Sequence, residues 1–180
     1  IFGILWFLII SNTSNSSKSG GMQGGPGMNN NSSATYSAVK EITKDEDITS
    51  GEYKSTNADE NVISVSGDVK STLSGITVSK TGDSDGGDNT SFYGTNSAII
   101  AKGGANVTIK NANITTDATG ANGVFSYGGS ATTNNSSSDN TTINISDSTI
   151  TTSKDNSGGI MTTGGGIMNA TNLTITTAGR

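Results

Sequence analysis

A segment that recurs along the chain constrains its fold more than any other feature. The copies align without gaps, alternate apolar with polar residues and end in Ile-Thr-Thr or a close variant. They occupy residues 107–116, 143–152 and 168–177, with a looser copy at 73–78. Self-similarity of this kind is typical of chains that stack one structural unit on the next. The alignment predicts that Ile109, Ile145 and Ala170 lie side by side on neighbouring strands, about 5 Å apart.

The spacing of the copies indicates a unit of constant length. Ile99 and Val124 are 25 residues apart, as are Ile150 and Ile175, whereas Ile114 and Ile150 are 36 apart. The longer step contains an insertion rich in Gly, Ser and Asn. The unit therefore keeps its length while one connecting loop varies, as loops on repeat proteins do.

Each unit offers three short strands, which in the second unit are residues 98–101, 107–110 and 113–117. Within them Val107 and Ile109 point to one face and the residues between them to the other. Gly and Asn at the joints supply the positive φ angles that sharp corners need. The sequence thus predicts an all-β right-handed parallel β-helix of about four to five coils, with three strands per coil, after a flexible N-terminal tail. An antiparallel two-sheet sandwich is the competing fold, but it does not explain copies in register.

Three further segments resemble a known group of proteins. They are residues 81–94 (TGDSDGGDNTSFYG), 121–127 (ANGVFSY) and 157–166 (SGGIMTTGGG). These segments resemble adhesin-like, pectate-lyase-type right-handed parallel β-helix proteins of microbial cell surfaces, and the likeness covers residues 45–180. The resemblance implies the same fold and a surface binding role, often towards carbohydrate.

Composition excludes several classes of function. The chain has no Cys and no His, which removes disulfides, thiol nucleophiles, the commonest general base and the commonest transition-metal ligand. Its only arginine is Arg180, and acidic residues outnumber basic ones by 15 to 10 without forming a basic stripe. A nucleic-acid partner is therefore not expected. Only 30% of residues are hydrophobic, but the net charge of −5 is small, so a thin linear core suits the chain better than disorder does.

The sequence divides into three parts. Residues 1–10 form an unbroken apolar run, which is shorter than the ~20 residues that span a bilayer and is expected to be a truncated signal peptide or membrane anchor. Residues 11–35 have the Ser/Asn/Gly-rich composition of a flexible linker. Residues 36–180 are the predicted β-helix domain, C-terminally truncated because the chain stops within a repeat. This organisation predicts an exported, extracellular or cell-surface protein that contacts the membrane only through its N-terminal segment.

A Gly-rich acidic segment is the one candidate metal site. Asp83, Asp85 and Asp88 supply oxygen ligands of the kind that Ca²⁺ prefers. The EF-hand pattern is not matched, because the Glu at its last position is missing. We therefore expect weak calcium binding, on the order of 10⁻⁴–10⁻³ M, or an ordinary solvated acidic loop, and no other cofactor.

Aromatic residues give a candidate ligand site. Phe92, Tyr93 and Tyr127 lie in or beside the insertions, close to Phe125. Gathered on one side, they would offer a surface on which a sugar ring stacks. The alternative is that Phe125 fills the core and the tyrosines cover the corners.

The leading hypothesis is a non-enzymatic, adhesin-like surface protein that binds carbohydrate, or a component of a host or neighbouring cell surface, through its corner loops. The first alternative is a polysaccharide lyase or hydrolase whose catalytic coils lie outside this fragment. For catalysis within the fragment, Lys102 or Lys110 would have to substitute for the basic catalytic residue that the resemblance to pectate lyases implies. The acidic residues at 45–47 and 59–60 are the candidate carboxylates of a hydrolase, or simply exposed charge. The second alternative is a structural stalk.

Overall fold

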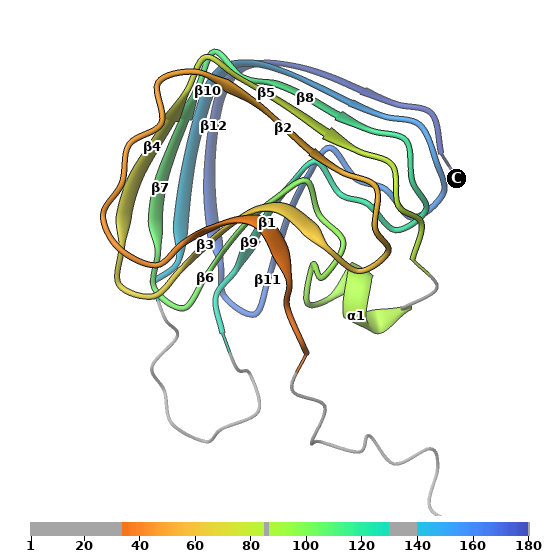
Figure 1. Ribbon diagram of the computed structural model, residues 1–180, viewed down its shortest axis with the longest axis horizontal. Coiled ribbons are helices and arrows are strands. Elements are labelled where there is room, and N and C mark those ends of the chain that lie inside the picture. Colours follow the sequence, from red (N-terminus) through yellow and green to blue (C-terminus); the bar gives the residue numbers. More distant parts are fainter. Residues whose placement is uncertain (1–33, 85–86, 130–139, 180) are drawn as a thin grey trace, which may run out of the picture. The chain divides into compact units, whose positions relative to one another are not determined.

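A computed structural model describes residues 34–84, 87–129 and 140–179 of the chain. These described residues form one compact unit, and its strands belong to two sheets in which every pairing is parallel (Figure 1). The predicted signal peptide or anchor at residues 1–10 lies outside the described residues, as does most of the linker predicted at residues 11–35.

The first sheet has five strands, and its order follows the chain. Successive members pair in register: Ile63 lies opposite Ile99, which lies opposite Val124, which lies opposite Ile160. The strands, in sheet order, are β1 (Ala38–Ile42), β3 (Asn61–Ser66), β6 (Ile99–Lys102), β9 (Val124–Tyr127) and β11 (Ile160–Thr163).

The second sheet has seven strands and curves into a half-barrel. Two of its strands are 11 residues long, and each of the others has four or five. In sheet order they are β2 (Gly51–Ser55), β5 (Ile76–Lys80), β8 (Asn113–Thr116), β10 (Thr142–Thr152), β7 (Asn106–Lys110) and β4 (Lys70–Ser74), with β12 (Ile167–Thr177) paired to β10.

The prediction of a single right-handed parallel β-helix, with three short strands per coil, is wrong. The strands form two parallel sheets, because two of the three strands expected in each unit belong to the same curved sheet. Strand β10 runs without a break through Asp147, which is equivalent to Asn111 in the joint expected between the strands at 107–110 and 113–117, and it pairs with both β7 and β8. Asp147 has a φ of 51°, and the equivalent Asn111 and Asn172 have the same value, so the backbone bends at these positions.

The pairing register that the repeats predict is confirmed. Ile145 pairs with Ile109 on one side and with Ala170 on the other. Past the bend, Ile150 lies between Ile114 and Ile175. The bend at Asp147 places two consecutive residues on the outer face, and the apolar side chains on both sides of it consequently point inward.

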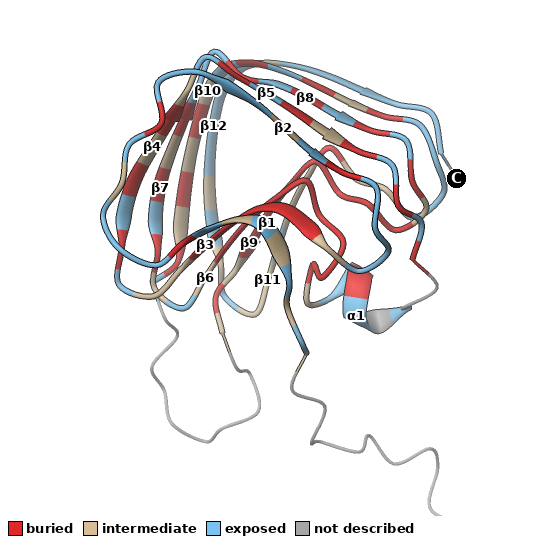
Figure 2. Cartoon of the chain, viewed as in Figure 1, coloured by how far each residue is buried: buried red, intermediate tan, exposed pale blue. Residues whose placement is uncertain are grey.

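The hydrophobic core lies between the two sheets (Figure 2). Each fully buried Ile or Leu side chain contributes roughly 1.5–3 kcal/mol through removal from water. The column of such side chains is thin, which suits a chain with so few apolar residues. Its largest fully buried aliphatic members are Ile42, Ile63, Leu73, Ile76, Ile99, Ile109, Ile114, Ile143 and Ile145.

Candidate functional site

The five-stranded sheet is covered on its outer face as well as its inner one. Ile100 and Phe125 are fully buried although they alternate with the inward-facing Ile99 and Val124. The segment that contains the short helix α1 (Asp88–Ser91) and the turn after it lies outside the space between the sheets (Figure 1). At Gly94 this segment comes so close that an added Cβ would lie 2.6 Å from the Phe125 ring.

Three aromatic rings meet on this covered face. The centroids of Phe92 and Tyr93 are 5.0 Å apart, those of Tyr93 and Tyr127 are 5.6 Å apart, and those of Phe92 and Tyr127 are 6.3 Å apart. All three contacts are edge-to-face, which is a favoured geometry for aromatic pairs. The Phe92 side chain is 40% exposed and is one of the few large apolar side chains at the surface of the described residues. We call Phe92, Tyr93, Tyr127 and their neighbour Tyr36 the aromatic cluster.

Hydrogen bonds hold the turn of the aromatic cluster on both sides. The Tyr36 hydroxyl donates to the Tyr93 carbonyl oxygen at 2.8 Å, and the Thr163 hydroxyl of β11 donates to the Phe92 carbonyl oxygen. Residues that are distant in sequence therefore hold the backbone of Phe92 and Tyr93 in place, so these two residues do not lie on an unsupported loop.

A lysine completes this arrangement. Lys102 pairs with Tyr127 across β6 and β9, and its Nζ lies 4.7 Å from the centroid of the Tyr36 ring. A cation at this distance from an aromatic face is attracted by the ring quadrupole. Burial lowers the pKa of Lys102, and the negative charge of Glu41 opposes that shift.

Two tyrosines of the aromatic cluster, Tyr36 and Tyr127, are held in the neutral form. Burial raises the pKa of Tyr36 strongly, and the neighbouring Tyr127 and Tyr93 raise it further. Burial also raises the pKa of Tyr127, with a smaller contribution from Tyr93. These hydroxyls therefore serve as hydrogen-bond donors and acceptors at physiological pH and do not act as bases.

The structure thus brings together Phe92, Tyr93 and Tyr127, the three residues predicted as a ligand site. Phe125 does not fill the main core, since it is buried between the outer face of the sheet and the turn at Gly94. Sequence analysis missed Lys102 and Tyr36 as members of the site. The 25-residue repeat does place Lys102 beside Tyr127, whereas no periodic signal links Tyr36 to a residue 57 positions away.

The predicted calcium site has little described geometry. Asp83 is exposed, and its Oδ1 accepts a hydrogen bond of 2.7 Å from the backbone N–H of Thr119. Asp85 and the side chain of Asp88 lie outside the described residues. Among the residues that are described, no group of three or more acidic side chains is placed to hold a metal ion. Calcium binding by this segment stays a prediction.

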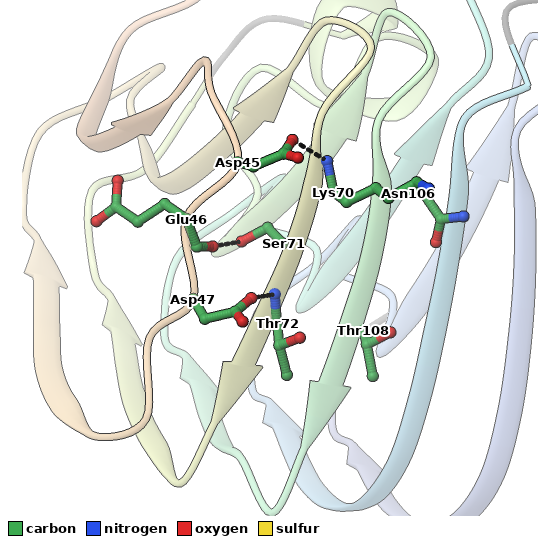
Figure 3. A pocket seen from close by; sticks show the side chains of 8 residues that line it. All are labelled: Asp45, Glu46, Asp47, Lys70, Ser71, Thr72, Asn106 and Thr108. Carbon is green, nitrogen blue, oxygen red and sulfur yellow. Dashed lines mark hydrogen bonds between the residues drawn. The ribbon is translucent and has the colours of Figure 1, made fainter.

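A polar groove on the outer face of β4 and β7 is a second candidate site (Figure 3). It has a volume of about 530 Å³ and is lined by three acidic residues, by Lys70, and by residues with hydroxyl or amide side chains. The carboxylates of Asp45 and Asp47 accept backbone hydrogen bonds from Lys70 and Thr72, at 2.8 and 2.7 Å, and so cover the edge of β4. The Glu46 carboxylate is paired with Lys40 at 2.6 Å. These acids therefore have structural partners, and the groove is lined by no aromatic ring.

The residues considered for an enzyme are not assembled into one site. Lys102 lies on the five-stranded sheet and Lys110 on the seven-stranded one. The Glu60 carboxylate accepts hydrogen bonds from Ser55 at 2.6 Å and from Asn57 at 3.0 Å, within its own turn. In the described part of the chain, the candidate carboxylates are thus engaged in holding turns and strand edges.

Comparison of the chain with known protein families, curated proteins and solved structures finds no match. The likeness to adhesin-like surface proteins consequently stands on the sequence segments quoted above. No helix within residues 34–84, 87–129 or 140–179 is long and apolar enough to cross a membrane.

Proposed function

We propose that this chain is a non-catalytic, surface-displayed binding module whose aromatic cluster binds carbohydrate. The observation that carries the proposal is that Phe92 and Tyr93, from the turn after α1, meet Tyr127 of β9 on one face, with Phe92 40% exposed. An apolar ring next to two tyrosine rings offers both apolar surface and hydroxyl groups, which suits a sugar with apolar C–H faces and polar edges.

The fixed position of the rings supports this function further. A site whose rings are already held in place loses little side-chain entropy when a ligand binds. Here hydrogen bonds from Tyr36 and Thr163 hold the backbone of the turn at Phe92 and Tyr93, and Gly94 packs directly against the Phe125 ring. Display at the cell surface, through the N-terminal apolar segment, is part of the same proposal.

The proposal is tested by screening the full 180-residue chain against an array of glycans and measuring the hits by calorimetry. Phe92→Ala should weaken binding about tenfold, because one stacking surface is lost. Ile175→Ala is the matched control: Ile175 is 41% exposed but lies on β12 of the other sheet, so its removal should leave affinity unchanged.

A second variant tests the geometry of the turn. An alanine Cβ at Gly94 would collide with the Phe125 ring, and the φ of 69° at this position disfavours any side chain. Gly94→Ala should therefore displace Phe92 and Tyr93 and abolish binding. If no glycan binds, or if Phe92→Ala binds as the unmodified chain does, the aromatic cluster is not a carbohydrate site.

A further inference from the structure

The Lys102 charge contacts the Tyr36 ring but has no carboxylate at ion-pair distance among the described residues. Lys102 belongs to neither of the two ion pairs in the described residues, Lys40–Glu46 and Lys154–Asp117. The Lys102 residue is half-buried, and its Nζ contacts the Tyr36 ring. A cation that is partly removed from water is costly unless an anion or another favourable contact compensates for it.

Lys102 lies next to the residues of the aromatic cluster. The residue faces outward at the end of β6, between Ser66 of β3 and Tyr127 of β9. Tyr36, whose ring it contacts, donates its hydroxyl hydrogen bond to the Tyr93 carbonyl. The ammonium group and the three predicted aromatic rings are thus parts of one surface.

We infer that the aromatic cluster recognises a sugar that carries an acidic group, either a carboxylate or a sulfate. The sugar ring lies against Phe92, and its acidic group pairs with the Lys102 ammonium group. This inference rests on the proposed carbohydrate-binding function and specifies its ligand class. A neutral sugar would cover the ammonium group without compensating for its charge, whereas an acidic sugar supplies a charge-assisted hydrogen bond.

The chemistry of the site also defines its selectivity. An ammonium group is a point charge, and the site has no arginine, whose bidentate hydrogen bonds would favour one anion over another. Carboxylate and sulfate should therefore bind with similar affinity. Glu41 is the acidic residue that acts electrostatically on Lys102, and it reduces the attraction for an acidic ligand.

The test uses matched sugars with the full chain. The glucuronide, galacturonide and mannuronide are each titrated beside their neutral methyl esters, and glucose 6-sulfate is titrated beside glucose. At least one acidic sugar should bind about tenfold more tightly than its neutral partner, and the difference should shrink as salt is added. The carboxylate and sulfate arms should show a preference of similar size for the acid over its neutral partner.

Three variants assign the preference to Lys102. Lys102→Met keeps an apolar stem over Tyr36 and should make the acid and its ester bind equally, while Lys102→Arg should retain the preference. Glu41→Gln should strengthen binding of the acid without changing that of the ester. Equal binding of acid and ester by the unmodified chain overturns this inference but leaves carbohydrate binding intact. Binding of no sugar at all overturns the proposed function itself.

Discussion

Among single residues, Lys80 has the most unusual environment. Its side chain is fully buried and donates hydrogen bonds to the carbonyl oxygens of Asn57 at 2.6 Å and Gly82 at 2.8 Å. It thereby joins two turns at the corner where β5 ends. Burial lowers the pKa of Lys80 to about 8, against smaller opposing contributions from the acids around it, Glu60 first.

This pKa predicts how stability changes with pH. Above pH 8 the folded protein releases the Lys80 proton, while the unfolded chain keeps it until about pH 10.5. The unfolded state then binds more protons, so the free energy of unfolding should rise with pH, by up to about 1.4 kcal/mol per pH unit from this group between pH 8 and 10. The cost of burying the charge is fully present below pH 8.

Urea unfolding of the unmodified chain and of Lys80→Met, at several pH values from 7 to 10, measures this effect. The difference in unfolding free energy between the two proteins should grow in favour of the unmodified chain as the pH rises. A difference that stays constant from pH 7 to 10 would show that Lys80 titrates normally in the folded protein.

At the scale of strands, the bends within the seven-stranded sheet explain its curvature. Asn111, Asp147 and Asn172 occupy equivalent places in the three repeats, and each has a φ of 51°. The Asn172 amide donates a hydrogen bond of 2.7 Å to the Asp147 carboxylate, and this bond is the main cause that lowers the pKa of Asp147. Asn and Asp are the non-glycine residues that adopt this conformation most readily.

Asn111→Val should therefore destabilise the protein by about 1–2 kcal/mol, because a β-branched residue is strained at positive φ. Asn113→Val is the matched control. Asn113 is also exposed but lies within β8 with an ordinary strand conformation, where valine is favoured, so the change should stay within about 0.5 kcal/mol. Chemical denaturation measures both values. Equal destabilisation by the two variants would mean that the bend does not depend on its residue type.

The same bends show how far the sequence predicts this fold. Strand register follows from the repeats, because one step of 25 or 36 residues aligns every apolar position with its neighbour. The division into sheets does not follow. Asn at a positive φ is compatible with a corner at which a strand ends and also with a bend within a continuous strand. Only the pairing hydrogen bonds of the residues before and after the bend distinguish these two cases.

The candidate site is predictable to a similar extent. Phe92, Tyr93 and Tyr127 are identifiable because aromatic residues are rare in this chain and lie beside the insertions. The contact with Tyr36 depends on how the segment before β1 returns across the sheet, and no repeat specifies that path.

At the scale of the whole compact unit, the two ends of the sheets differ. Towards the N-terminal end, Asp45 and Asp47 accept the backbone hydrogen bonds of the β4 edge, and charged residues line β1 and β2. At the other end, β12 pairs with β10 on one side, and no strand of the described residues pairs with its other side. Strand β12 has no charged residue, and its Ile167 and Ile175 are 45% and 41% exposed.

An uncharged strand edge with exposed apolar side chains recruits other chains, so the 180-residue chain should self-associate through β12. Ile175→Lys places a charge beside this edge, while the lysine stem still covers the apolar surface near Gly159. Sedimentation velocity at increasing concentration should show less association for this variant than for the unmodified chain, with an unchanged melting temperature. Val39→Lys, at a 51% exposed position on the charged β1, should sediment as the unmodified chain does. If Ile175→Lys associates as strongly as the unmodified chain, contacts elsewhere on the protein drive association and the β12 edge is not its cause.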